Sequence, residues 1–202
     1  MLEKKPTSRQ LRATKTRKLI YDVAVKLMDE QGFAVTTIEE ISKRAGVSVG
    51  TFYHYFKSKE DIFYDLFKKA DEYFESVVAP DLKTLADSGA TVSEQIVRYF
   101  VQYSAYNDER GLENINQLYN TKNELFSRKG RFMQELLKEL IARGQAAGEL
   151  SLELSPDDAT DFLFIASRGL VFDWCIHNGG YDLRTKMEGY IRRLVATLQA
   201  AR

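Results

Sequence analysis

The sequence predicts an all-α protein built as a small three-helix domain, residues 1–60, followed by a larger helical domain, residues 61–202. Apolar residues recur at helical spacing in one segment after another, and no segment alternates apolar and polar residues as a half-buried strand would. About nine helices follow from that periodicity. With 202 residues, of which 44% are hydrophobic, the chain is long and apolar enough to bury a real core.

The composition argues against several classes of protein. The single cysteine, Cys175, rules out an internal disulfide and suits a reducing cytoplasm. No apolar run approaches the roughly 18 residues of a membrane-spanning helix. The charged start, MLEKKPTSRQ, is not followed by the apolar stretch of a signal peptide. We therefore expect a cytoplasmic protein that makes no contact with a membrane.

The first helix is predicted from near Thr14 to Gln31, and Gly32 is its expected C-terminal stop. Its inward residues follow the spacing i, i+3, i+4, i+7 and i+8. They are Ile20, Val23, Ala24, Leu27 and Met28. The outer face begins with three basic residues, Lys15, Arg17 and Lys18. This helix is therefore expected both to brace the helices that follow and to approach a phosphate backbone.

Two short helices joined by a glycine turn follow in TTIEEISKRAGVSVGTFYHYFKSK, residues 36–59. Thr37 is the expected N-cap of the first, with Glu40 completing a capping box. Gly46 supplies the left-handed residue that ends this helix, and Ser48 is the expected cap of the second. The inward residues of the second helix are Phe52 and Phe56. The pattern is that of a helix-turn-helix, which places its second helix in the DNA major groove.

The solvent face of that second helix suits contact with DNA. Its residues are small, hydroxylated or aromatic and none is acidic, and Lys57 and Lys59 follow where the next helix begins. Small residues let a helix approach base edges, and lysines bind phosphates. Residues 1–60 hold 12 Lys or Arg against 7 Asp or Glu, although the whole chain is neutral. The alternative, that the aromatic residues only pack a three-helix unit, applies best to Tyr55.

The segment AGVSVGTFYHYFKSKEDIF, preceded by TTIEEI, resembles the DNA-binding end of the tetracycline-repressor (TetR) family of bacterial transcription regulators. The resemblance implies a homodimer in which the recognition helix of each subunit enters one major groove of a palindromic operator. By that resemblance Thr37, Ser48, Thr51, Tyr53, His54 and Lys57 match positions that usually touch phosphate or base. The full set of candidate DNA contacts is Lys18, Thr37, Ser48, Val49, Gly50, Thr51, Tyr53, His54, Lys57 and Lys59.

Helical periodicity continues through the larger domain. A helix from Ser58 keeps one apolar stripe to Val77, is expected to end before Pro80, and links the two domains. Further helices are expected near residues 93–107, 112–119, 132 to 144 or 148, 155–176 and 182–198.

The helix that follows Ser155 is the most apolar stretch of the chain, and a helix that is apolar nearly all round must be covered on more than one side. We therefore expect the last two helices to pair with their copies in a second subunit as a four-helix bundle. The expected interface residues are Phe172, Tyr190, Ile191, Leu194 and Leu198.

Many large aromatic residues lie in the second domain. Most belong to an ordinary core, but several buried tyrosines suggest a cavity with polar points, and the resemblance implies a small-molecule effector there. The candidate ligand contacts are Phe67, Phe74, Tyr99, Tyr103, Tyr119, Phe164, Arg168 and Phe172. Arg168 lies midway along the most apolar helix. Its guanidinium must be matched by an acid on another helix, by the copy of this helix across the dimer, or by an anionic group of the effector.

No catalytic constellation is evident, since there is neither a glycine-rich phosphate loop nor a G-x-S-x-G elbow. Cys175 and His177 are two residues apart, which is wrong for facing the same way on a helix, and two ligands make a poor zinc site. We therefore expect no enzyme, no cofactor and no metal. The leading hypothesis is a dimeric repressor that is released from its operator by an effector. The alternative is a DNA-binding protein of the same fold with a filled core, controlled by a protein partner or used architecturally.

Overall fold

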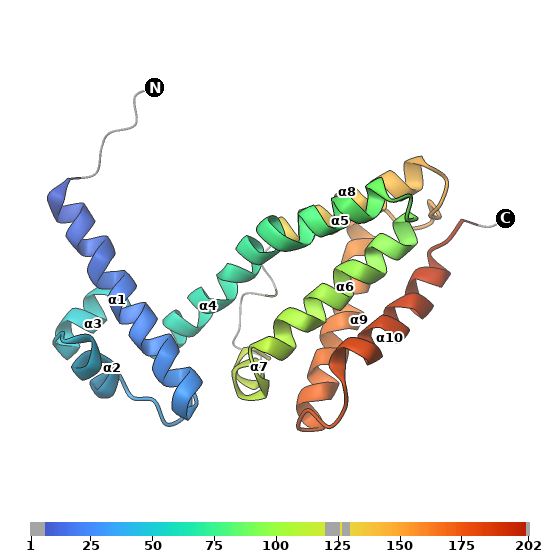
Figure 1. Cartoon of the computed structure of the whole chain (residues 1–202). Helices are drawn as coiled ribbons and strands as arrows, with labels where there is room; N and C mark the ends of the chain where they lie inside the picture. Colours follow the sequence, from blue (N-terminus) through green and yellow to red (C-terminus); the bar gives the residue numbers. More distant parts are fainter. Residues whose placement is uncertain (1–6, 120–125, 127–129, 201–202) are drawn as a thin grey trace. The chain divides into compact units, whose positions relative to one another are not determined.

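The computed structural model describes residues 7–119, 126 and 130–200, without the side chains of residues 29, 63–68 and 117 (Figure 1). Throughout this part the chain is α-helical and forms no strand, as predicted; the one β-type contact is an isolated bridge between Leu150 and Gln199. The chain divides into two compact units, Met1–Lys68 and Lys69–Arg202. That division falls inside the helix Lys59–Tyr73 (α4), eight residues beyond the predicted boundary at residue 60.

The first unit contains α1 (Ser8–Gln31), α2 (Ile38–Ala45), α3 (Val49–Tyr55) and the first part of α4. Helix α1 begins six residues before the predicted start at Thr14, because Thr7 and Gln10 form a capping box there. The core of the unit is apolar and buried, and it consists of Ile20, Ala24, Leu27, Ile41, Phe52, Phe56 and Ile62.

The caps of the helix-turn-helix are those expected, with one exception. Thr37 Oγ1 accepts a hydrogen bond from the N–H of Glu40 at 3.2 Å, and Gly46 is left-handed with φ 67°. The predicted return bond from Glu40 to the backbone of Thr37 is replaced, because Glu40 Oε2 accepts from Gln31 Nε2 at 2.7 Å. The carboxylate of Glu40 therefore joins α2 to the end of α1 instead of closing a capping box.

The second unit contains the end of α4, η1 (Phe74–Val78), α5 (Ala79–Asp87), α6 (Val92–Glu109), α7 (Leu112–Leu118), α8 (Phe132–Ala146), α9 (Pro156–Ile176) and α10 (Leu183–Thr197). Helix α6 packs along α10 and also contacts α8 and α9, so it is central to the bundle (Figure 1). Ser155 and Asp182 cap α9 and α10 as predicted. None of the helices in the described part of the chain is long and apolar enough to cross a membrane.

Pro80 does not end the helix that precedes it, contrary to the prediction. Residues 74–78 form a π-turn instead, in which the N–H of Ala79 bonds to the carbonyl of Phe74, and α5 continues beyond the proline. The ring of a proline displaces the carbonyl four residues before it, and a wide turn accommodates that displacement. As a result Val78 is buried, whereas Val77, predicted to lie on the apolar stripe, is 44% exposed.

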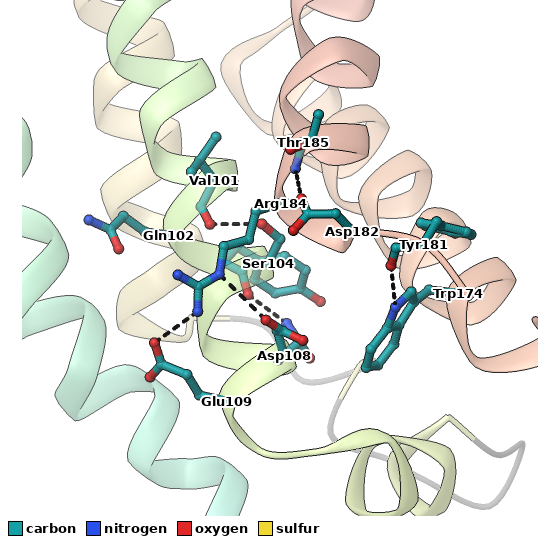
Figure 2. Close-up of polar contacts among 12 residues, drawn as sticks. Val101, Gln102, Ser104, Asp108, Glu109, Trp174, Tyr181, Asp182, Arg184 and Thr185 are labelled. Carbon is teal, nitrogen blue, oxygen red and sulfur yellow. Dashed lines mark hydrogen bonds and ion pairs between the residues drawn. The ribbon is translucent and has the colours of Figure 1, made fainter. Parts of the chain in front are cut away.

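The start of α10 is fixed against the end of α6 (Figure 2). Arg184 Nη2 lies 3.1 Å from Glu109 Oε1, and its Nε lies 3.5 Å from Asp108 Oδ2. In the turn between α9 and α10, Trp174 Nε1 donates to the carbonyl of Tyr181 at 3.1 Å. These contacts join the start of α10 to the end of α6 and hold the turn after α9 against Trp174.

Candidate DNA-binding and effector sites

Helix α3 presents the expected side chains to solvent. Tyr53 is 54% exposed and His54 is exposed. Phe52, on the opposite side of the helix, faces the core and is completely buried. Ser48 Oγ accepts a hydrogen bond from the N–H of Thr51 at 3.0 Å, which starts the helix at the predicted position. The exposed side of α3 therefore carries an aromatic ring, an imidazole and a run of small residues.

Gly50 has no packing role inside the chain. It is exposed, and a Cβ atom placed on it would meet only Ser48 Oγ, at 3.7 Å. Glycine inside a helix costs about 1 kcal/mol relative to alanine. With Val49 and Thr51 beside it, Gly50 lets another surface approach the backbone of α3 closely. Tyr55 is half-buried and packs edge-on against His54, which places it among the packing residues.

The predicted lysine contacts separate into two groups. Lys57 is exposed and uses its backbone N–H to bond Asp61 Oδ2 at 2.8 Å, whereas its side chain extends from the end of α3. The ammonium of Lys59 instead donates to the carbonyls of Phe33 at 2.6 Å and Thr36 at 2.9 Å. Lys59 therefore holds the turn after α1 to the start of α4, so its ammonium is engaged within the chain. Lys18 is exposed and paired with Asp22 one turn along α1.

In the second unit, aromatic rings gather between α6, α9 and η1. Phe74 contacts Tyr99 with ring centroids 4.9 Å apart, and Phe164 contacts Tyr99, Phe100 and Tyr103 at 5.6–6.2 Å. We call these five residues the aromatic cluster. Tyr99 is completely buried, and its hydroxyl donates to the carbonyl of Met133 at 2.5 Å. Burial raises the pKa of its hydroxyl well above the ordinary value, so it stays protonated and acts as a donor.

Arg168 borders this cluster together with a pair of tyrosine hydroxyls. The Tyr103 and Tyr119 hydroxyls are 3.0 Å apart. Arg168 donates from Nε to the carbonyl of Phe164 at 3.0 Å and from Nη1 to the carbonyl of Phe126 at 3.1 Å, and its guanidinium lies 5.3 Å from the Phe126 ring centroid. No carboxylate pairs with it within the described part of the chain. Of the three partners considered for Arg168, an acid on another helix is therefore not observed among the residues that the structure describes.

Not all of the predicted ligand residues come together. Phe74, Tyr99, Tyr103, Tyr119, Phe164 and Arg168 lie in or beside the aromatic cluster. Phe172 does not, since it is 50% exposed on the outer side of α9, and the side chain of Phe67 lies outside the described residues. A separate pocket of about 230 Å³ opens between the end of α8, the start of α9 and the end of α10, with Leu154 and Phe162 in its wall. It is smaller than an ordinary ligand site.

Comparison with known proteins places the chain among bacterial transcription regulators. The sequence profile described as bacterial regulatory proteins, tetR family, matches residues 20–66. The fatty acid metabolism regulator protein of Bacillus subtilis (strain 168) is 28% identical over 184 residues, which cover 88% of this chain and 92% of that protein. The chain belongs to the TetR family. As a member of this family it is a DNA-binding transcriptional regulator and not an enzyme.

Solved structures of FadR regulators share the fold over about nine-tenths of the chain. The FadR regulator of Bacillus subtilis, crystallised with stearoyl-CoA, superposes with a TM-score of 0.68 at 26% identity and covers 90% of this chain and 99% of its own. Thermus thermophilus FadR, a TetR-family repressor, gives a TM-score of 0.69 at 21% identity, covering 92% and 96%. The second likeness supports the fold alone.

In this TetR-family regulator the predicted interface residues differ in accessibility. Phe172 and Tyr190 are exposed, Leu194 and Leu198 are half-buried, and Ile191 is completely buried in the core of its own chain. Ile191 therefore offers no surface to a second subunit. A continuous exposed stripe runs along α9 at helical spacing and consists of Phe162, Ile165, Gly169, Phe172 and Ile176. We call it the outer stripe of α9.

Sequence reasoning missed one polar pair beside the aromatic cluster. Arg131, immediately before α8, places Nε 3.1 Å from Asp71 Oδ2 on α4. The two residues are 60 positions apart and neither belongs to a recognisable motif, so only the fold reveals their contact. The side chain of Arg131 is 14% exposed, which makes this pair the most buried ion pair among the described residues.

Proposed function

We propose that this regulator is a homodimeric repressor that binds a palindromic operator through α3 of each subunit and is released from it by a long-chain acyl-CoA. The first unit would bind DNA in the bacterial cytoplasm, and the second would carry the effector and the subunit contact. The candidate DNA contacts are those predicted from the sequence without Lys59. The effector site would lie between the aromatic cluster and Arg168.

The observation that carries this proposal is the length of the match to the fatty acid regulator of Bacillus subtilis. The family profile covers residues 20–66 only, whereas the similarity to that regulator extends over 88% of the chain. Because the DNA-binding end alone would be similar in any member of the family, similarity in the second unit bears on the effector. The structure of FadR from the same organism holds stearoyl-CoA.

The chemistry of the second unit suits such a molecule. An acyl-CoA combines a long apolar chain with phosphates, so its site needs an apolar interior and cationic groups. The aromatic cluster supplies the first, and Arg168, which bonds carbonyls but no carboxylate of the described chain, supplies the second. One of the three partners considered for Arg168 from the sequence, an anionic group of the effector, is of the same chemical kind.

The outer stripe of α9 supports the dimer. Ile165 is 65% exposed and Ile176 is 61% exposed, and a run of large apolar side chains over four turns of one helix is unusual on a monomer surface. Gly169 lies in the middle of the stripe with open space around it, so a facing helix can approach closely there. With Tyr190 on α10, these residues form a face suited to a second copy of the same pair of helices.

Binding to selected DNA tests the proposal. An operator fragment would first be selected from random DNA by the wild-type protein, and its complex then titrated with dodecanoyl-CoA, octadecanoyl-CoA, CoA and dodecanoate. We expect the two acyl-CoA esters to release the DNA, and at 100-fold excess over Kd to stabilise the free protein by about 2.7 kcal/mol in thermal unfolding. No stabilisation and no release by any acyl-CoA would refute the effector assignment and leave DNA binding intact.

The second candidate function is the regulator with a filled core. It is favoured by the close packing of the aromatic cluster, in which Tyr99, Phe100 and Phe74 are completely buried. Under it, none of the four compounds changes the unfolding temperature or the operator affinity, and a protein partner would have to be sought. The same titrations therefore separate the two functions.

A further inference from the structure

The ion pair between Asp71 and Arg131 joins two helices that are far apart in the sequence. Asp71 lies on the last turn of α4, the helix that runs on from the DNA-binding unit, and Arg131 stands at the start of α8. Asp71 Oδ2 lies 3.1 Å from Arg131 Nε, and Asp71 Oδ1 accepts from the N–H of Met133 at 3.2 Å. One carboxylate thus binds a guanidinium and caps the first turn of a helix at the same time.

The guanidinium of Arg131 is only partly satisfied by this pair. Its Nη2 is buried and finds no hydrogen-bond partner among the residues described. A buried N–H donor of a charged group costs free energy when it is left unpaired. Most ion pairs in this chain are exposed, but Arg131 is 14% exposed and Asp71 29%, so this one holds its charge close to the interior.

The Asp71–Arg131 ion pair is connected to the proposed effector site through the backbone of one residue, Met133. The N–H of Met133 donates to Asp71, and its carbonyl accepts from the hydroxyl of Tyr99 in the aromatic cluster. The charges of Arg168 and Arg131 both lower the pKa of Tyr103, although burial has the larger effect and raises it. Arg168 on α9 and Arg131 at the start of α8 thus both act electrostatically on the same tyrosine.

We propose that Arg131 binds an anionic oxygen of the effector through its free Nη2 and exchanges Asp71 for that oxygen, so that effector binding and the hold of α8 on α4 exclude one another. This inference rests on the proposed function and adds the way in which the effector is sensed. The anionic oxygen belongs to a phosphate of an acyl-CoA or to the carboxylate of a free fatty acid. Both are bidentate partners of arginine, and either competes with an aspartate.

The exchange has a thermodynamic signature. If the ion pair favours the DNA-binding state, then breaking it from the Asp71 side weakens operator binding and frees Arg131 for the effector. Coupling between two sites is reciprocal, so both changes come from one equilibrium. Replacing Arg131 also weakens operator binding, but it removes the guanidinium that binds the effector, so effector affinity falls. The two halves of one ion pair should therefore have opposite effects on effector affinity.

The experiment compares D71N and R131Q in the full-length protein. Asparagine keeps the acceptor for the N–H of Met133 and removes the charge, and glutamine keeps much of the arginine stem. Dodecanoyl-CoA, dodecanoate and CoA are titrated against each protein without DNA by calorimetry, and operator affinity is measured without effector. We expect D71N to bind dodecanoyl-CoA about tenfold more tightly than wild type and R131Q about tenfold more weakly. Both should bind the operator more weakly.

The matched control is D81N, which removes the carboxylate from an exposed ion pair with Arg98, 2.7 Å apart, in the same unit. It should change neither affinity. If wild type binds dodecanoyl-CoA but D71N and R131Q change its affinity in the same direction, the pair is only structural and the exchange is refuted while the proposed function stands. If wild type binds dodecanoate and not dodecanoyl-CoA, the oxygen is a carboxylate. If it binds neither, the proposed function fails first and the exchange with it.

Discussion

Lys57 and Lys59 are two positions apart, but their side chains have different surroundings. Lys57 extends into solvent, whereas the ammonium of Lys59 is enclosed by the carbonyls of Phe33 and Thr36 and lies 4.4 Å from the centroid of the Phe33 ring. A sequence pattern gives both the same charge and nearly the same place. The two side chains differ because the turn after α1 directs its backbone carbonyls toward α4, where they accept hydrogen bonds from Lys59.

At the residue scale, substitutions of Lys57 and Tyr53 should affect DNA affinity in different ways. Lys57→Ala should weaken binding to all DNA sequences alike and reduce the salt slope by about 0.9 per subunit, because one phosphate contact is lost. Tyr53→Ala should cost more on the selected operator than on random DNA. Titrations at several salt concentrations measure both. Lys26→Ala, an exposed lysine on α1 paired with Glu30, is the control. Unchanged operator affinity in both variants would remove α3 from the interface.

Residue roles could be predicted from the sequence where a local rule decides them, and not where the fold does. Thr37, Gly46 and Ser48 were assignable because caps and left-handed turns depend on neighbours within four positions. Arg168 was recognisable as a charge on an apolar helix, but its carbonyl partners were not. Arg131 gave no signal at all, because its partner Asp71 is distant in the chain.

At the scale of single elements, the start signals at Ser155 and Asp182 predict the limits of α9 and α10 to within one residue. The π-turn was not predictable in this way. Proline is normally read as the end of a helix, and nothing local indicates that residues 74–78 widen and let the helix continue. The packing of Phe74 and Val78 against the bundle favours the wider turn, and that is a property of the fold.

Helix packing gives an element-scale prediction at Gly144 on α8. A Cβ atom there would lie 2.8 Å from side-chain carbons of Leu150 and Val92, both buried. Gly144→Ala should lower the free energy of unfolding by about 1–2 kcal/mol, since overpacking outweighs the gain in helix propensity. Gly189→Ala, on α10 with open space around it, should be neutral or stabilise by up to about 1 kcal/mol. Urea unfolding of both variants measures the difference, and equal effects would contradict it.

At the scale of the whole molecule, the charge distribution and the outer stripe of α9 point to different partners. The basic residues are concentrated in residues 1–60, whose surplus suits phosphates, whereas the exposed apolar residues of α9 suit another protein surface. The sequence predicted that α9 and α10 would form a bundle with their copies, but not which faces of the two helices would be exposed in one subunit. Ile191 was expected at the interface because helical spacing alone does not tell the inner face of a helix from the outer one.

Assembly should therefore depend on Ile165 and not on the exposed apolar residues elsewhere. Ile165→Glu would bury a charge between two subunits, which costs about 3 kcal/mol or more and raises the dimer dissociation constant over 100-fold. Operator affinity should fall with it, although α3 is untouched. Val77→Glu, at an exposed position on η1, should leave the dimer intact. Light scattering decides the matter, and a stable Ile165→Glu dimer would place the subunit contact on another face.

The buried thiol of Cys175 has a practical consequence for following repression in solution. Burial raises its pKa to about 11, so that near neutral pH only about one thiol in 10,000 is ionised and reactive. We therefore expect the wild-type chain to react only slowly with maleimide or methanethiosulfonate reagents. A cysteine introduced at exposed Lys43 on α2, outside the candidate DNA contacts, would be labelled preferentially. In the proposed dimer, a spin label on each subunit would report the spacing of the two DNA-binding units by pulsed electron resonance, with and without acyl-CoA.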